Sequence, residues 1–310
     1  MSWNPALTPG SPEAVAPEAI ETLIIPRARD LGGFEVRRAL PAPKRQMVGP
    51  FIFFDQMGPV EFLTEQGIDV RPHPHIGLGT VTYLYSGTFQ HQDSTGANQI
   101  ITPGELNWMV AGRGVSHSER SPQAARKAPH KLFGIQTWIA LPEHAEDNEA
   151  FFEHHGAETL PQIEAEGVNA RLILGHAYGK KAPATLFSEA FYLDVTLAAG
   201  ARFPLPDDHE DRGIYVTQGS VTVAGQEFQA GQMMVFRPGD HITVAAGAQG
   251  ARLMALGGAT LGGPRHIWWN FVASSKERIE HAKEEWRAGR WGQGLFDLPP
   301  DDRGEFIPLP

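Results

Sequence analysis

The sequence predicts an all-β protein of two domains with one helix near its C-terminus. Its 310 residues exceed the length at which a single hydrophobic core usually keeps growing, which favours two cores. The chain contains 34 Gly and 25 Pro, and short apolar or alternating runs recur between turns that hold these residues. Both features are typical of strand-rich proteins with tight turns.

The first half of the chain reads as a series of strands bounded by Gly and Pro. The expected strands are Leu23–Ile25, Phe34–Leu40, Phe51–Asp55, Thr80–Tyr85, Leu106–Val110 and Gly134–Leu141. Turns are expected at Ser86-Gly87 and Pro103-Gly104. We assign residues 21–142 to an N-terminal domain, and the acidic stretch 143–170 to a connector with some helix.

The second half repeats this pattern. Phe191–Leu197 alternates as a strand, and Gly213–Val223 reads as a strand, a turn and a strand. When Ser86-Gly87 is laid on Gln218-Gly219 and Pro103-Gly104 on Ala230-Gly231, strands and turns follow in the same order. This order predicts an internal duplication, with residues 171–310 as the C-terminal domain.

A helix closes that domain and precedes a short tail. Ser274–Glu277 fits a capping box, and Gly289 stands where a helix should end. Ile279, Ala282 and Trp286 are spaced along one face, so we expect a structural, amphipathic helix.

Composition excludes several classes of partner. A formal charge of −10 disfavours direct nucleic-acid binding and anionic membranes, because both attract Lys and Arg. The absence of Cys excludes disulfides and thiolate sites, which leaves His, Asp and Glu as the strong metal ligands. Residues 1–20 lack the basic start and apolar core of a secretory signal, so we expect a flexible N-terminal tail on a cytoplasmic protein.

Two short motifs carry the candidate chemistry: His73-Pro74-His75 and His117-Ser118-Glu119. Residues two apart in a strand point to the same face, so each motif can aim both side chains at one point inside a barrel. Three imidazoles and one carboxylate would form a site for a divalent transition metal. In the duplicated half, the three His positions fall on Leu205, Asp207 and Val244, so that half lacks the ligand set.

Spacing alone does not select the acidic motif. The 13 His and 36 acidic residues give about one and a half His-x-Asp/Glu pairs by chance. The chain has four such pairs: His91/Asp93, His117/Glu119, His144/Glu146 and His209/Asp211. We favour His117/Glu119 because it follows an apolar strand and a Gly-rich turn, where a buried carboxylate is costly unless it is paired or binds a cation. We expect His91/Asp93 to be polar and exposed on both faces, and His209/Asp211 to lie in a solvated turn.

The order of these motifs resembles the cupin superfamily and, more closely, the pirin family. Five segments carry the resemblance: Asp30–Pro41, Gly49–Asp55, Pro72–Leu78, Gly112–Glu119 and Arg265–Val272. The resemblance covers about residues 22–288 and implies a bicupin, with two cupin-type β-barrels and one metal in the N-terminal barrel. It implies His73, His75, His117 and Glu119 as ligands. The general cupin acid would follow His-x-His, but Leu78 and Gly79 stand there, and Glu119 supplies the acid instead.

Two functions are implied by the resemblance. One is a metal-dependent 2,3-dioxygenase that oxidises flavonols such as quercetin with O2; the other is an iron-dependent regulator that binds a transcription factor or a metabolic enzyme. We expect one divalent metal per chain, Fe(II) first and Mn, Co, Ni, Cu or Zn as alternatives. Glu119 would act as the catalytic general base. The expected substrate-pocket residues are Phe53, Trp108, Met109 and Gln136.

Overall fold

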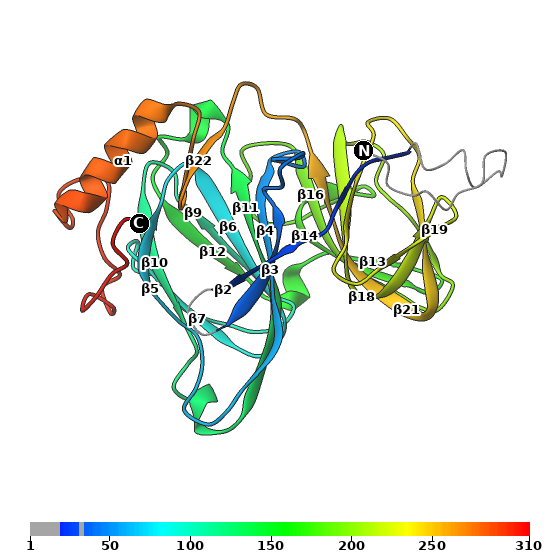
Figure 1. Cartoon of the computed structure of the whole chain (residues 1–310), viewed down its shortest axis with the longest axis horizontal. Coiled ribbons are helices and arrows are strands. Elements are labelled where there is room, and N and C mark those ends of the chain that lie inside the picture. Colours follow the sequence, from blue (N-terminus) through cyan, green and yellow to red (C-terminus); the bar gives the residue numbers. More distant parts are fainter. Residues whose placement is uncertain (1–18, 31–33) are drawn as a thin grey trace. The chain divides into compact units, whose positions relative to one another are not determined.

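The computed structural model describes residues 19–30 and 34–310 and confirms the all-β class. In these residues it contains the strands β1 to β23 and one α-helix, α1 (Figure 1). They fall into two compact units. The N-terminal barrel unit comprises 28–30, 34–36, 53–157 and 262–310, and the C-terminal barrel unit comprises 19–27, 37–52 and 158–261.

These units differ from the contiguous ranges expected from the sequence, 21–142 and 171–310. In the C-terminal barrel unit, Gly49 N–H donates to Asp211 Oδ2 at 2.7 Å, and the rings of Phe51 and Tyr192 lie 5.3 Å apart. These long-range contacts, with sequence separations above 140, assign residues 37–52 to that unit. Local patterning carries no signal for such contacts, so the sequence alone could not divide the chain in this way.

The strands around the His motifs form a seven-stranded sheet, a four-stranded sheet and a two-stranded hairpin. The first sheet has the order β12-β9-β6-β11-β4-β3-β2, with bounds Phe151–His155, Leu106–Val110, Leu78–Ser86, His130–Ala140, Phe51–Phe62, Glu35–Leu40 and Arg27–Asp30. The second has the order β5-β10-β7-β8, with bounds Asp69–His75, Val115–Arg120, Phe89–Asp93 and Asn98–Ile101. The hairpin pairs β22 (His266–Trp268) with β23 (Phe271–Ala273).

The C-terminal barrel unit is built on one ten-stranded sheet. Its main path is β1-β20-β18-β21-β16-β14-β13, with bounds Ile20–Ile24, Met233–Phe236, Asp211–Val223, Thr243–Gly258, Ala190–Leu197, Val168–Ala177 and Gln162–Ala165. Off this path lie β15 (Lys180–Lys181), β17 (Arg202–Pro204) and β19 (Gln226–Gln229). The turn expected within 213–223 is absent from β18. Gly219 instead forms an irregularity at a φ of +72°, and the strand continues through it.

Equivalent hydrogen bonds in the two units support the duplication. Gly104 N–H donates to Leu84 O at 3.0 Å, and Gly231 N–H donates to Val216 O at 2.8 Å, which are matching positions in the overlay. The strand register differs by two residues at the metal positions. His73 lies opposite His117, whereas Phe203 rather than Leu205 lies opposite Val244. A shift of two preserves the face, so apolar side chains still fill that position.

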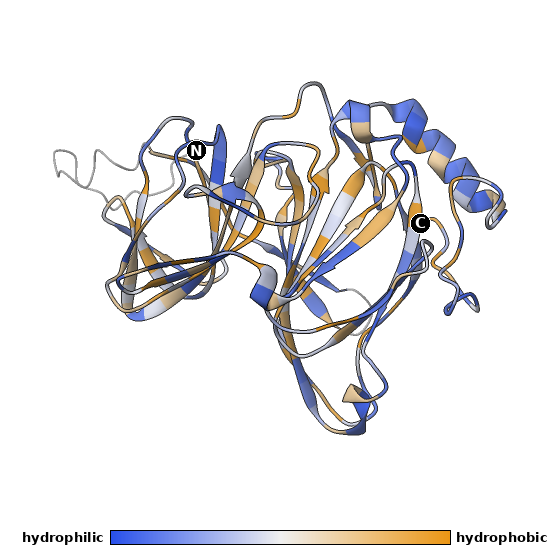
Figure 2. Cartoon of the chain, turned by 180° about the vertical axis from the view of Figure 1, so that it is seen from behind, coloured by the Kyte–Doolittle hydropathy of each residue, from blue (hydrophilic) through white to orange (hydrophobic). Residues whose placement is uncertain are grey.

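The helix α1 (Lys276–Ala288) forms where expected, but its N-cap lies one residue beyond the Ser274 of the expected capping box, and it belongs to the N-terminal barrel unit. Ser275 is its N-cap, Gly289 ends it at a φ of +62°, and the predicted apolar face is buried. That face packs in one cluster with Ile76 and Phe271. The rest of α1 is predominantly hydrophilic (Figure 2).

The connector holds less helix than expected. Its helical parts are the 3-10 turns Glu143–Ala145 and Ala157–Thr159, while β12 and β13 supply strands; a further 3-10 turn lies at Ala125–Lys127. Most of the expected N-terminal tail lies outside the described residues, but Ile20 is buried and begins β1. None of the helices in the described ranges is long and apolar enough to span a membrane.

Candidate metal centre

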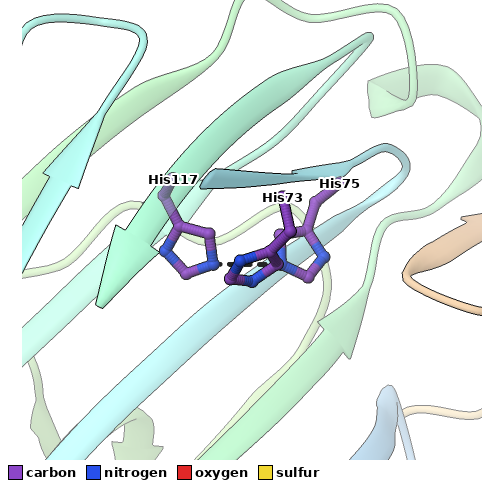
Figure 3. A group of neighbouring side chains, drawn as sticks. All are labelled: His73, His75 and His117. Atoms are coloured by element: carbon purple, nitrogen blue, oxygen red, sulfur yellow. Dashed lines mark hydrogen bonds between the residues drawn. The ribbon is translucent and has the colours of Figure 1, made fainter. Parts of the chain in front are cut away.

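Adjacent antiparallel strands bring the three motif histidines together. His73 and His75 lie on β5, and His117 lies on β10 directly opposite His73. All three side chains are buried and offer nitrogen atoms within 4.8 Å of one another. Figure 3 shows the rings converging on one point between the two strands.

Backbone carbonyl groups fix the protonation of two rings. His73 Nδ1 lies 2.9 Å from Arg71 O, and His75 Nδ1 lies 3.1 Å from Asn270 O. A carbonyl oxygen only accepts, so each Nδ1 carries the proton and donates it. The Nε2 atom of each neutral ring is therefore left with a free lone pair, which is the form that binds a metal.

A buried Asp-His pair fixes the third ring. His91 Nε2 donates to Asp93 Oδ2 at 2.8 Å, and His91 Nδ1 lies 3.3 Å from His117 Nδ1. Because His91 uses its proton on the carboxylate, its Nδ1 accepts and His117 Nδ1 donates. The lone pair of His117 Nε2 is thereby directed into the group of three.

The donor set fits a divalent metal ion. His75 Nε2 and His117 Nε2, joined by a dashed line in Figure 3, lie only 3.1 Å apart. In the tautomers derived above neither nitrogen has a proton to donate, so both bear lone pairs. Two nitrogens bound about 2.1 Å from one ion at a right angle lie about 3.0 Å apart. Burial lowers the pKa of His73 to about 4 and that of His75 and His117 well below the usual value. The rings are thus neutral at neutral pH and ready to coordinate.

Glu119 lies beside this group but is not one of its members. It follows His117 by two residues on β10, where the pairing with β5 is irregular between them. Its Oε1 accepts a hydrogen bond from Gln136 Nε2 at 2.5 Å. Burial raises the pKa of Glu119 to about 7, against the opposing effect of the Gln136 hydrogen bond. The carboxyl group can therefore exchange a proton near neutral pH.

The other expected pocket residues fall at different places. Phe53 stacks on Trp138 at 4.0 Å, and Trp138 meets the edge of His75 at 5.2 Å. Trp108 is fully buried in β9, where its ring occupies the space above Gly79. Met109 packs with Ala111, Val115 and Phe152. Trp138 thus separates Phe53 from His75, and Gln136 contacts Glu119 beside the His group.

The exposure expected for His91 and Asp93 is wrong. The strand β7 alternates, so that Phe89, His91 and Asp93 are buried while Gln90 and Gln92 are half-buried. The alternation Phe-Gln-His-Gln-Asp was the signal that could have placed this pair inside.

The two other His-x-acid pairs contain buried side chains. Glu146 is buried and accepts hydrogen bonds from Ser274 N and Oγ at 2.7 and 2.6 Å, just before α1 begins. His209 and Asp211, expected in a solvated turn, are both buried. Asp211 accepts from Arg45 at 2.5 Å as well as from Gly49.

The chain is similar to known proteins along nearly all its length. The Pirin family model matches residues 33–139, and the Pirin C-terminal cupin domain model matches residues 192–292. A pirin-like protein of Caulobacter vibrioides is 45% identical, with 94% of this chain and 99% of that protein covered. The crystal structure of a quercetin 2,3-dioxygenase from Acinetobacter baumannii matches with a TM-score of 0.86 and 32% identity, over 96% of each chain.

A more distant match shares the fold. The bacterial pirin YhhW of Escherichia coli, crystallised with nickel(II), gives a TM-score of 0.61 at 18% identity, over 77% of this chain and 99% of that one. Together, the two family models and the 45% identical relative show that the chain belongs to the pirin family.

Proposed function

We propose that this protein is a metal-dependent dioxygenase that cleaves flavonols such as quercetin with O2. Its metal, Fe(II) in our proposal, would be held by His73, His75 and His117, with Glu119 as the fourth ligand. The observation that carries the proposal is the convergence of three buried, neutral imidazoles whose free lone pairs face one point. The similarity to a quercetin 2,3-dioxygenase supports the choice of substrate class.

The donor set supports an open centre rather than a closed structural one. Three imidazoles and one carboxylate leave two positions of an octahedral ion free, whereas structural zinc sites are closed by four ligands. When bound, the metal would supply positive charge that orients and polarises the adjacent keto and hydroxyl oxygens of a flavonol.

The protein's own residues would handle the proton and the solvent. Glu119, whose pKa is raised by burial in the metal-free protein, would leave or share the metal and take the proton of the flavonol hydroxyl group as a general base. Gln136 holds the carboxyl group by the hydrogen bond to Oε1, and so orients it. The burial of His75, His117 and Glu119 excludes bulk water, which strengthens electrostatic interactions inside the site.

Oxygen uptake tests the proposal. Metal-free protein is loaded anaerobically with Fe(II) and desalted, and O2 consumption is followed after quercetin is added. We expect uptake by the parent and by His241→Ala, an 86% exposed control. His117→Ala should lose both the iron and the uptake, while circular dichroism shows that it remains folded. Iron retention by the parent without O2 uptake would reject the dioxygenase function and favour the iron-dependent regulator.

A further inference from the structure

A second group of metal-ligand side chains lies in the C-terminal barrel unit. His176, Asp208 and His209 offer ligand atoms within 4.8 Å of one another. Glu189 adjoins them, because its Oε1 lies 3.4 Å from His176 Nε2 and 3.9 Å from His209 Nδ1. We propose that His176, Glu189 and His209 form a second site, with Asp208 beside it, which binds a divalent ion of the Zn²⁺ class.

The buried ring of His209 is the main observation. Its side chain is 0% exposed, and its Nε2 donates to the carbonyl oxygen of His176 at 3.0 Å. A carbonyl oxygen only accepts, so Nδ1 of the neutral ring bears the lone pair. Nδ1 is buried and has no hydrogen-bond partner among the described residues, and its neighbour at 3.9 Å is the Glu189 carboxylate. A lone pair facing a carboxylate is unfavourable unless a cation lies between them.

The distances fit one ion. Ligand atoms about 2.1 Å from a tetrahedral ion lie about 3.4 Å from one another. The observed separations are 3.4 Å from His176 Nε2 to Glu189 Oε1 and 3.9 Å from Glu189 Oε1 to His209 Nδ1. Asp208 Oδ1 lies 3.6 Å from His209 Nε2, the nitrogen that carries the proton, so Asp208 lies beside the ligand set. The carbonyl group that orients His209 plays the part of the outer hydrogen-bond partner found on metal-bound histidines.

The fold brings the four residues together from three segments. His176 is the last residue but one of β14, Glu189 directly precedes β16, and Asp208 and His209 lie in the loop before β18. Gly175 permits the close approach of β14 to β16, since a Cβ there would overlap the carbonyl oxygen of Ala190. Beyond the loop, Arg212 donates to Pro206 O at 3.2 Å and fixes its start.

The site is accessible on one side. His176 and Glu189 are 43% and 51% exposed, and both line a cavity of about 470 Å³ that also contains Lys181, Thr185 and Ser188. A bound ion would therefore keep room for water or a small oxygen-donor ligand. Two imidazole nitrogens and one carboxylate oxygen, with water as the fourth ligand, suit Zn²⁺, and Co²⁺ serves as a spectroscopic substitute.

Metal titration of the full chain tests this site. Metal-free parent protein, His176→Ala and Glu189→Gln are titrated with Zn²⁺ by calorimetry and with Co²⁺ by visible absorption. We expect His176→Ala to bind one equivalent fewer than the parent, and Glu189→Gln to weaken that equivalent by at least tenfold. Loss of the corresponding Co²⁺ band is expected in His176→Ala.

The control is His241→Ala, an exposed histidine of the same unit that pairs with Asp207. It should bind as the parent does. Equal stoichiometry and affinity in the parent and His176→Ala would overturn the proposal. So would an equal loss in His241→Ala, which would indicate unspecific binding to surface histidines. The double variant His73→Ala/His75→Ala should retain the second equivalent, so failure of one site is distinguishable from failure of the other.

Discussion

The two barrel units share a strand frame but differ in what fills it. In the N-terminal barrel unit, the paired positions on β5 and β10 hold His73 and His117. In the C-terminal barrel unit, the corresponding pair is Phe203 and Val244, which lie in one apolar cluster. The same turn hydrogen bonds, from Gly104 and from Gly231, frame both. The strand frame therefore sets where side chains meet, and the residue types decide whether that position holds an apolar core or a group of possible metal ligands.

The largest effect is expected when the acid is replaced in the N-terminal centre, which is the group of His73, His75, His117 and Glu119. Glu119→Gln should lower kcat with quercetin by about 100-fold or more, the range of general-base catalysis, because the amide cannot take the hydroxyl proton. KM should change much less. Steady-state O2 uptake measures both constants, with the 77% exposed Glu149→Gln as control. Equal losses in kcat and in substrate affinity would count against the base role.

The next prediction places an imidazole in the apolar barrel. Val244→His buries a polar ring without a partner and overfills the core, so the free energy of unfolding should fall by about 2–4 kcal/mol. Urea unfolding measures this loss. Thr243→His, at the half-buried neighbouring position, should cost much less. An unchanged free energy of unfolding, or an additional bound metal in Val244→His, would contradict the conclusion that this position in the C-terminal barrel unit is an apolar core.

A smaller effect on metal affinity is expected when Asp93, which holds His91 against His117, is changed. Asp93→Asn keeps an oxygen acceptor for His91 but removes its charge, so metal affinity at the N-terminal centre should fall about 10–100-fold. Calorimetric titration measures the affinity, and the absorption spectrum of the Co²⁺ form should shift. The exposed Asp301→Asn is the control. If Asp93→Asn binds metal with the affinity of the parent, the Asp93-His91 pair has no positioning role.

The smallest expected effect is a change with pH in the number of protons released when the N-terminal centre binds a metal. Glu119, whose pKa is raised to about 7, is mostly protonated at pH 6 in the metal-free protein, while the three histidines are already neutral. If Glu119 becomes a ligand, metal binding at pH 6 should release about one proton, and at pH 8 about none.

Calorimetry in buffers of different ionisation enthalpy measures this release. The His176→Ala background restricts loading to the N-terminal centre. Glu119→Gln should release none at either pH, and release by this variant at pH 6 would assign the proton to another group.

Much of the fold and the His group could be predicted because the signals are local. An apolar run marked β9, period-two alternation marked β16, and Gly289 marked the end of α1. His73, His75 and His117 were found because spacing by two in a strand fixes the face. The discontinuous units and the placement of α1 depend on long-range contacts, such as Gly49 with Asp211, which leave no pattern in the local sequence.

The Asp93-His91 pair and the burial of His209 were missed for a related reason. In the sequence, a buried polar residue that is hydrogen-bonded to another polar group cannot be told from an exposed one until its partner is known. Gln90 and Gln92 suggested exposure, although the alternation across β7 places His91 inside. The buried ring of His209 is compensated by a hydrogen bond to the carbonyl oxygen of His176, and this partner lies 33 residues away in the sequence.

Anomalous diffraction at the iron edge, from crystals of the Fe(II)-loaded protein grown anaerobically, tests whether His73, His75 and His117 bind the metal. We predict a peak about 2.1 Å from Nε2 of His73, His75 and His117. The same peak should be absent from His117→Ala crystals prepared in the same way. A map without a peak among these three rings, from protein that retains iron in solution, would contradict the account.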